Sequence, residues 1–360
     1  MSGLPAIARR PAPSGARGTL AGLPYVTSVL TIEGNGAAIE RGSSLGCAVE
    51  HGPVPTDFRL LLVMDGASLT VDRATLRNGC ADGSGLEAEG GGVLALGSLT
   101  LRRVTLSGNQ AAASGALSIG SSGLIEDSAF VANHASYFGG AIGLAADATG
   151  TVRNSTFSGN SAGSVGGAVI VGGSMTLEHV TFAQNTAMDG GGIASIGGIN
   201  PMPGNGDVYA KNILLSASPC RALEGGVWTA EGTNLDSGTS CDVTFGTGVT
   251  PNAAIHLGPL ADNGGPTPTR ALLPDSDGID AATDCTVFGG GAPIATDQRG
   301  APRPIDGDGD SVARCDVGAY EYVPGGVQSF DEIPTLGPGA LALLVLALAV
   351  AGFVASRPRG

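Results

Sequence analysis

The residues best suited to chemistry are three aspartates in the run DGDGD: Asp306, Asp308 and Asp310. Carboxylates that alternate with glycine can wrap a hard cation such as calcium, which prefers oxygen ligands. A calcium loop of the helix-loop-helix type starting at Asp306 would need a glutamate at its twelfth position, where this chain has valine. Asp316 or Glu321 would then have to complete a site of another geometry. Two interpretations stay open, a calcium site and a solvated acidic turn.

Other catalytic constellations are absent from the sequence. It contains no nucleophile elbow, phosphate-binding loop or metal-ligand doublet, and of the four histidines only His179 falls on an expected strand. The formal net charge of −14 argues against nucleic acid as a partner. We therefore expect no catalytic residues, and no cofactor apart from the calcium considered above.

The cysteines indicate an oxidising compartment. The chain has six cysteines, and none of them lies in a C-x-x-C arrangement. We therefore expect an exported, disulfide-bonded protein and no zinc site. Six cysteines permit fifteen connectivities, of which sequential pairing is our prediction. The predicted pairs are Cys47 with Cys80, Cys220 with Cys241, and Cys285 with Cys315.

Because the chain is rich in small residues, the first question is whether it folds or is disordered. With 61 glycines and 21 prolines the chain approaches the composition of disordered proteins. However, 42% of the residues are hydrophobic and only 14% are charged, so there is apolar surface to bury. Aromatic residues make up 4%, which predicts an aliphatic core.

A repeat runs through the glycine-rich middle of the chain. Segments such as LTLRRVTLSGN (99–109), GTVRNSTFSGN (150–160) and MTLEHVTFAQN (175–185) align, and their large residue before the turn recurs every 24 to 30 residues. A fixed period near 25 predicts a solenoid. Leucine-rich repeats would need a helix or a leucine-bearing arc in the second half of each repeat, where this chain has glycine, serine and alanine. The pattern therefore favours a parallel β-helix.

The spacing within a repeat predicts two short strands joined by a corner near Arg102 and Arg103, because the inward residues are two apart on either side of it. A column of asparagines would lie at the next corner, where this residue tolerates unusual φ and ψ and its side chain can bond neighbouring backbone. Stacked coils would turn the column into a ladder of Asn109, Asn133, Asn160 and Asn185.

One outward column alternates in charge down the expected stack. Residues of opposite sign would pair between coils and set the register rather than act in catalysis. The column consists of Asp72, Arg102, Glu126, Arg153 and Glu178.

The two ends of the chain differ. The first 22 residues have no apolar core of a secretory signal, so we expect a signal peptide and early coils upstream of a truncated start. Residues 336–356 are almost entirely apolar and are followed by arginines, which predicts a transmembrane anchor with a cytoplasmic end in preference to a buried core helix.

Three sequence features resemble known families. The repeats look like those of polymorphic outer membrane proteins and related bacterial right-handed β-helix surface proteins, and this resemblance implies a right-handed parallel β-helix. LGPLADNGGPTPTRALLPDSDGID, ATDQRGAPRP and CDVGAYEY closely resemble the choice-of-anchor Q domain family. DEIPTL before the apolar run is similar to IPTL-type sorting signals of Gram-negative bacteria, with Ile333, Pro334, Thr335 and Leu336 in place but without the usual tryptophan.

These observations predict an all-β chain with five parts. They are a disordered or truncated segment (1–22), a parallel β-helix (23–257), an irregular choice-of-anchor Q-like cap (258–323), a linker with the sorting motif (324–335) and the anchor (336–356). The resemblances imply export to the cell surface, attachment to the envelope and processing by a sorting protease. We expect a structural or adhesin-like protein, with a carbohydrate or protein ligand. The alternative is a β-helix polysaccharide lyase or glycoside hydrolase.

Overall fold

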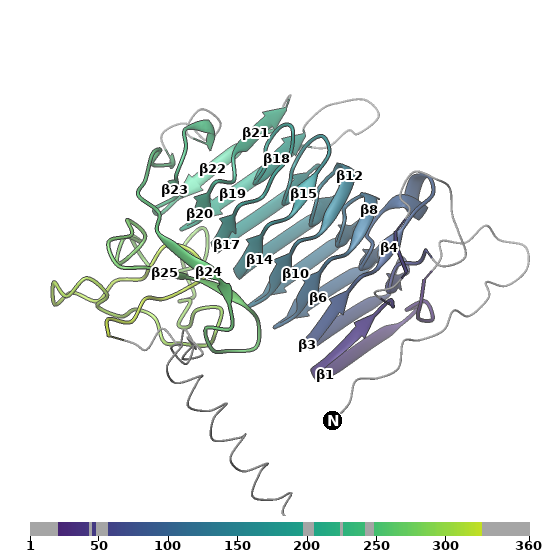
Figure 1. Ribbon diagram of the computed structural model, residues 1–360, viewed down its shortest axis with the longest axis horizontal. Coiled ribbons are helices and arrows are strands. Elements are labelled where there is room, and N and C mark those ends of the chain that lie inside the picture. The colour runs from purple at the N-terminus through teal and green to yellow at the C-terminus, as the bar shows by residue number, and fades with distance from the viewer. Residues whose placement is uncertain are drawn as a thin grey trace, which may run out of the picture. The chain divides into compact units, whose positions relative to one another are not determined.

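Successive turns of the chain stack as parallel strands and form an all-β parallel solenoid in the computed structural model (Figure 1). The structure describes residues 21–42, 45–47, 57–196, 205–223, 226–241 and 248–325. Each coil visits three sheets in turn, and the described chain up to Pro324 belongs to one compact unit. The all-β class and the parallel solenoid predicted from the sequence are therefore confirmed.

The largest sheet, here called the long sheet, has twelve strands. They are β1 (Val29–Glu40), β3 (Ser68–Arg77), β6 (Ser98–Arg102), β7 (Thr105–Ser107), β10 (Ser122–Glu126), β11 (Ala129–Val131), β14 (Thr149–Ser158), β17 (Ser174–Ala183), β19 (Asp207–Lys211), β20 (Leu214–Ser216), β22 (Trp228–Glu231) and β23 (Leu235–Asp236).

Two smaller parallel sheets complete each coil. The four-strand sheet contains β4 (Cys80–Ala81), β8 (Gln110–Ala113), β12 (His134–Phe138) and β15 (Ser161–Ala162). The seven-strand sheet contains β2 (Leu61–Val63), β5 (Val93–Ala95), β9 (Leu117–Ile119), β13 (Ile142–Leu144), β16 (Val169–Val171), β18 (Ile193–Ile196) and β21 (Cys220–Leu223). A short 3-10 helix, η1 (Gly85–Ala88), and an antiparallel hairpin of β24 (Leu257–Ala261) and β25 (Thr269–Leu272) lie outside these sheets.

Three of the corners in each coil are marked by a residue with positive φ. The first corner divides the long sheet and carries Arg73, Arg103, Asp127, Asn154, His179 and Asn212. The second leads into the four-strand sheet and carries Asn78, Gly108, Ala132, Gly159, Gln184 and Ala217. The third leads into the seven-strand sheet and carries Gly90, Ser114, Gly139, Gly166 and Gly190. The left-handed backbone region thus recurs at fixed places in the repeat.

The glycine that follows the third corner is required by the close approach of neighbouring coils. A Cβ on Gly140 would lie 2.0 Å from the carbonyl oxygen of Gly167, and one on Gly167 would lie 2.3 Å from that of Gly191. No side chain fits at such distances. The paired glycines that give the sequence its linker-like appearance are therefore a packing requirement of an ordered stack.

The four predicted ladder asparagines stack inside the second corner and are fully buried. The Oδ1 atom of Asn160 accepts hydrogen bonds from the backbone nitrogen of Asn133 at 3.0 Å and from its Nδ2 atom at 2.9 Å. The Nδ2 atom of Asn160 donates to the carbonyl of Phe130 at 2.9 Å. The same pattern joins Asn109 to Asn133, and Asn185 ends the ladder on the Ser218 hydroxyl.

One detail of the asparagine prediction needs correction. The asparagines do not adopt positive φ; the residue before each of them does, as at Gly108 and Gly159. The strain falls on that residue because it makes the turn, while the asparagine points inward and satisfies buried backbone groups of two coils.

The core consists of columns of like residues. Phe130, Phe157 and Phe182 stack with ring centroids 4.6 and 4.9 Å apart and are fully buried. Leu76 and Leu106 precede them in the same column, and Leu215 follows. The rings can stack because the parallel register places each one directly above its equivalent.

The charged column of the long sheet pairs between coils. Arg153 lies between Glu126 at 3.1 Å and Glu178 at 2.7 Å, and Arg102 contacts Glu126 at 3.0 Å. Asp72, although in register with Arg102, binds the corner residue Arg103 instead, with Nε at 2.8 Å from Oδ1. The alternation predicted from the sequence therefore joins four successive coils, from Arg102 to Glu178, and Asp72 at its start has a different partner.

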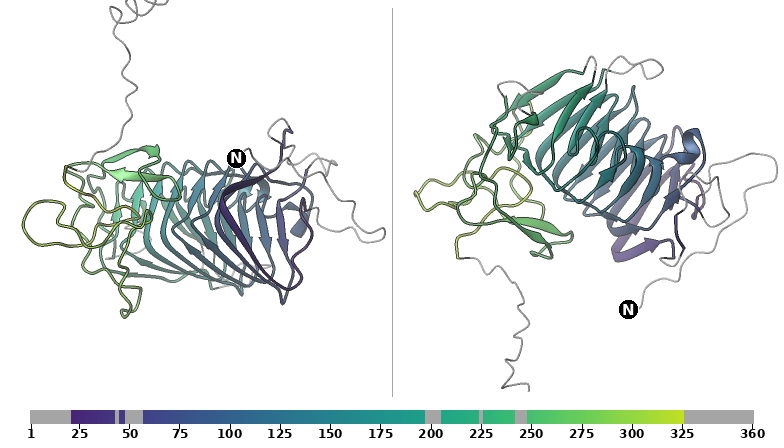
Figure 2. Two further views of the ribbon diagram at one scale, coloured as in Figure 1. Left: turned by 90° about the horizontal axis from the view of Figure 1, so that it is seen from below. Right: turned by 45° about the horizontal axis from the view of Figure 1, so that its top comes forward.

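The segment predicted as a cap is largely irregular and covers one side of the solenoid (Figures 1 and 2). Thr156 donates from Oγ1 to Gln298 Oε1 at 2.6 Å, and the Thr181 hydroxyl accepts from the backbone nitrogen of Ala319 at 2.9 Å. Leu214, on the same outer face, packs in a separate small core with residues of this segment. We call residues 254–322 the covering segment.

The predicted anchor and the motif at 333–336 lie outside the described residues. Within the described ranges, no helix has the length and apolar composition needed to cross a bilayer.

The ladder generates a stability prediction. Asn160→Leu should lower the free energy of unfolding by about 2 kcal/mol or more, because it leaves buried backbone and amide groups without partners. Chemical denaturation monitored by circular dichroism measures the change. Asn205→Leu, at an exposed position, is the matched control and should change stability little. Equal effects of the two substitutions would contradict the ladder's role.

Candidate functional site

The acidic run predicted to bind calcium forms an exposed loop closed by a fourth aspartate. Carboxylate oxygens of Asp280, Asp306 and Asp308 lie within 4.8 Å of one another. Asp310, which the sequence grouped with them, pairs with Arg314 at 2.9 Å. Asp280 lies 26 residues upstream of Asp306, in the stretch PDSDGID, so no local spacing could have revealed it.

Hydrogen bonds show what the carboxylates of this loop do. Asp280 Oδ2 accepts from the backbone nitrogens of Gly307 at 2.6 Å and Asp308 at 2.7 Å. Asp306 accepts from Gly309 and Ser311 at 2.8 and 2.9 Å. Such bonds hold the loop in shape without a cation, which favours the acidic-turn interpretation. The oxygen donor set would also suit calcium, through lone pairs that these bonds leave free.

The three sequential cysteine pairs are disulfide-bonded. The Cα atoms of Cys47 and Cys80 are 5.7 Å apart, and those of the pairs formed by Cys220 with Cys241 and Cys285 with Cys315 are 4.8 and 5.8 Å apart. The prediction of sequential pairing is confirmed. The last bridge joins two parts of the covering segment.

The motif DQRG of the covering segment forms a buried polar cluster. Asp297 is fully buried and accepts from the backbone nitrogens of Arg299, Ala301 and Glu321 at 2.8 to 3.0 Å. The Arg299 guanidinium lies 2.7 Å from Asp297 Oδ2 and 3.6 Å above the ring centre of Tyr320. The motif residues thus tie two distant loops together.

A second buried cluster connects the covering segment to the solenoid. Arg303 lies with its Nε 3.4 Å from Glu321 and donates to the carbonyl of Gly318 at 2.7 Å. Its Nη1 atom also donates to Nδ1 of His179, the one histidine on an expected strand, at 2.5 Å. Because arginine can only donate, this nitrogen of the imidazole is unprotonated. His179 is therefore a structural contact residue.

The carboxylic acids of this cluster have perturbed pKa values. Burial, followed by the charge of Glu321, raises the pKa of Asp316 to about 8. Burial also raises the pKa of Glu321, against the opposing influence of Arg303. Burial and the charge of Arg303 hold the pKa of His179 well below its ordinary value of 6.5. Sequence reasoning considered Asp316 and Glu321 only as calcium ligands and missed this role.

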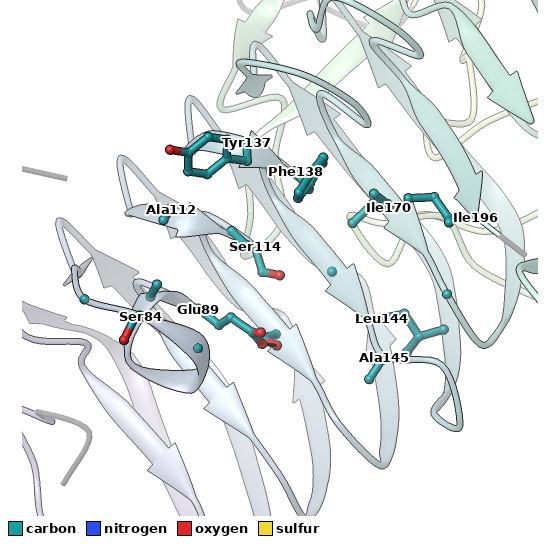
Figure 3. Close-up of a pocket in the computed structure, with 17 residues that line it drawn as sticks. Ser84, Glu89, Ala112, Ser114, Tyr137, Phe138, Leu144, Ala145, Ile170 and Ile196 are labelled. Carbon is teal, nitrogen blue, oxygen red and sulfur yellow. Dashed lines mark hydrogen bonds between the residues drawn. The ribbon is translucent and has the colours of Figure 1, made fainter. Parts of the chain in front are cut away.

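A groove of about 480 Å³ opens on the surface of the solenoid (Figure 3). It lies over the third corner, between η1 and strands of the four-strand and seven-strand sheets. Tyr137 and Phe138 of β12 project at its rim, and Ser114, Ser118 and Glu89 supply polar atoms within it. The Ser118 hydroxyl donates to Glu89 Oε2 at 2.7 Å. Sequence analysis did not find this groove, because its walls come from several coils.

No protein-family model, curated protein or solved structure matches this chain.

The acidic loop generates a test of metal dependence. Asp280→Ala should lower the free energy of unfolding by about 2 kcal/mol, with or without calcium, because backbone donors lose their partner. Thermal unfolding of both proteins in calcium and in a chelator measures this, with the exposed Asp65→Ala as control. If the chelator destabilises the unsubstituted protein as much as the substitution does, the loop is a calcium site.

The buried acids generate a prediction for pH. Asp316 has a folded pKa of about 8 against an ordinary 3.8, so its stabilising contribution is fully present at low pH and is lost as pH rises towards 8. Below 6.5 the depressed pKa of His179 opposes this trend, because protonating His179 costs stability there. Between pH 6.5 and 8 the free energy of unfolding should therefore fall as pH rises, and Asp316 alone contributes at most about 1.4 kcal/mol per pH unit to this slope.

Denaturation of the unsubstituted protein and of Asp316→Asn across that pH window checks the prediction. The slope should be smaller in Asp316→Asn, whatever its absolute stability. An unchanged slope would show that Asp316 is not the titrating group.

Proposed function

We propose that this protein is a non-enzymatic, exported scaffold displayed on the cell surface, with a structural or adhesin-like role. The observation that carries the proposal is that the charged side chains of the long sheet are engaged in structural contacts. On the long sheet they pair between coils, and Lys211 and Glu178 also bind the covering segment, at Asp284 and the backbone of Phe288. Groups engaged in this way stabilise the register and are not free for acid–base chemistry.

The enzymatic alternative would need a different arrangement. Glycoside hydrolysis ordinarily uses two carboxyl groups that flank the scissile bond. Among the described residues that line the groove, Glu89 is the only carboxylic acid. The remaining lining is apolar or hydroxyl-bearing, which suits binding better than catalysis.

Export and anchoring form the second part of the proposal. Three disulfides fit an oxidising compartment. The sequence resemblances add a choice-of-anchor Q-type covering segment, an IPTL-type sorting signal at residues 333–336 and a membrane anchor at 336–356, all in a Gram-negative envelope. A right-handed coil is part of the proposal, because parallel crossover connections are right-handed in nearly all proteins.

Deleting residues 333–360 tests whether this part of the chain anchors the protein to the cell surface. The intact protein, expressed in a Gram-negative host with an export signal, should be labelled by a membrane-impermeant reagent on whole cells. The deletion variant should appear in the culture medium with its disulfides formed, because the solenoid and covering segment do not include the deleted residues. Retention of the deletion variant on cells would contradict the anchoring role.

A further inference from the structure

The groove arises where small residues interrupt an outward column of the seven-strand sheet. The middle residues of β5, β9, β13 and β16 are in register and face outward; they are Leu94, Ser118, Gly143 and Ile170. The two small residues lie between two large ones, so the surface is hollowed over two adjacent coils. The column continues with Leu62 before these residues and with Ala194 and Arg221 after them.

Ser114 is a second exception at the same place. Its φ is +57°, at a corner where Gly90, Gly139, Gly166 and Gly190 occupy the equivalent positions. A side chain is strained in this backbone region, and glycine is the residue that avoids the strain. Ala132 and Gln184 hold positive φ at the second corner, so it is the departure from glycine at the third corner that sets Ser114 apart.

The two exceptions fit one another. A Cβ on Gly143 would lie 2.0 Å from the Ser114 hydroxyl oxygen, so glycine at 143 provides the space that this hydroxyl occupies. Ser114 is only 5% exposed, and its hydroxyl has no hydrogen-bond partner among the described residues. It therefore presents a pre-positioned polar atom in the groove.

The rim supplies aromatic surface beside these polar atoms. Tyr137 and Phe138 are 48% and 41% exposed, with ring centroids 6.1 Å apart, although aromatic residues are scarce in this chain. Glu89 adds a carboxylate on the opposite side of the groove (Figure 3). A few convergent polar atoms within apolar and aromatic walls are typical of a small-ligand site.

We propose that this groove binds a neutral saccharide. The aromatic rings would pack on the apolar face of a sugar ring, while Ser114 and Glu89 would hydrogen-bond its hydroxyl groups. This inference rests on the proposed display function, for which it supplies the ligand class.

Two other ligand classes fit less well. An extended peptide would need a free strand edge to pair with, but β9, β13 and β16 are each hydrogen-bonded on both sides. An anionic ligand, including an acidic sugar, would meet the Glu89 carboxylate, and the described residues lining the groove include no lysine, arginine or histidine. A neutral, hydroxyl-rich ligand avoids both problems.

The test measures binding of neutral oligosaccharides of glucose, mannose and N-acetylglucosamine to the full-length protein by saturation-transfer NMR and calorimetry. Tyr137→Ala and Ser114→Gly should each weaken binding about tenfold or more. Ser114→Gly should leave the melting temperature unchanged or raise it, because glycine relieves the strain at this corner. Met188→Ala, at an exposed position outside the groove lining, is the control and should bind like the unsubstituted protein.

The possible outcomes separate this inference from the proposed function. Failure of every neutral oligosaccharide to bind, or binding unaffected by Tyr137→Ala and Ser114→Gly, would overturn the saccharide site and leave the display function intact. Preferential binding of oligogalacturonate or of peptides would also overturn it. New reducing ends in the incubated samples would instead contradict the non-enzymatic function.

Discussion

The fold depends on the fixed backbone spacing between stacked coils. Parallel strands of adjacent coils lie about 4.8 Å apart, so every position of the repeat lies directly over its equivalent in the next coil. Positions where the coils approach most closely must be glycine, as Gly140 and Gly167 are. Positions that face the interior must stack like on like, which is what the phenylalanine column and the asparagine ladder do. The glycine-rich composition follows from this one constraint.

Much of the solenoid could be predicted because its determinants recur. Inward residues two apart, the asparagine column and the alternating charges are visible once the repeats are aligned. The positive φ before each asparagine was less accessible, since Gly108, Ala132 and Gln184 share no chemistry that marks a corner. The calcium prediction missed Asp280 because folding, and not spacing, brings it to Asp306. The groove was invisible because it depends on adjacent coils differing from one another.

The covering segment lacks a repeat, so its contacts could not be derived from periodicity. Asn154 donates to the carbonyl of Thr296, 142 residues away, at 2.8 Å. The motifs that suggested a family resemblance form buried polar clusters around Asp297 and Arg303. Buried charges are costly unless paired, and here they specify how this segment meets the solenoid. One side of the long sheet is thereby covered, whereas the groove lies over the third corner and the seven-strand sheet.

Amide hydrogen exchange tests the central claim most directly, namely that the small-residue repeats are an ordered stack. The account predicts that the backbone amides of Asn109, Asn133 and Asn160, which donate to the next asparagine along the ladder, exchange only through global unfolding. Residues 159–168, rich in glycine, serine and alanine, should also be strongly protected at their coil-to-coil hydrogen bonds. Exchange of this segment at the rate of an unstructured peptide would contradict the account.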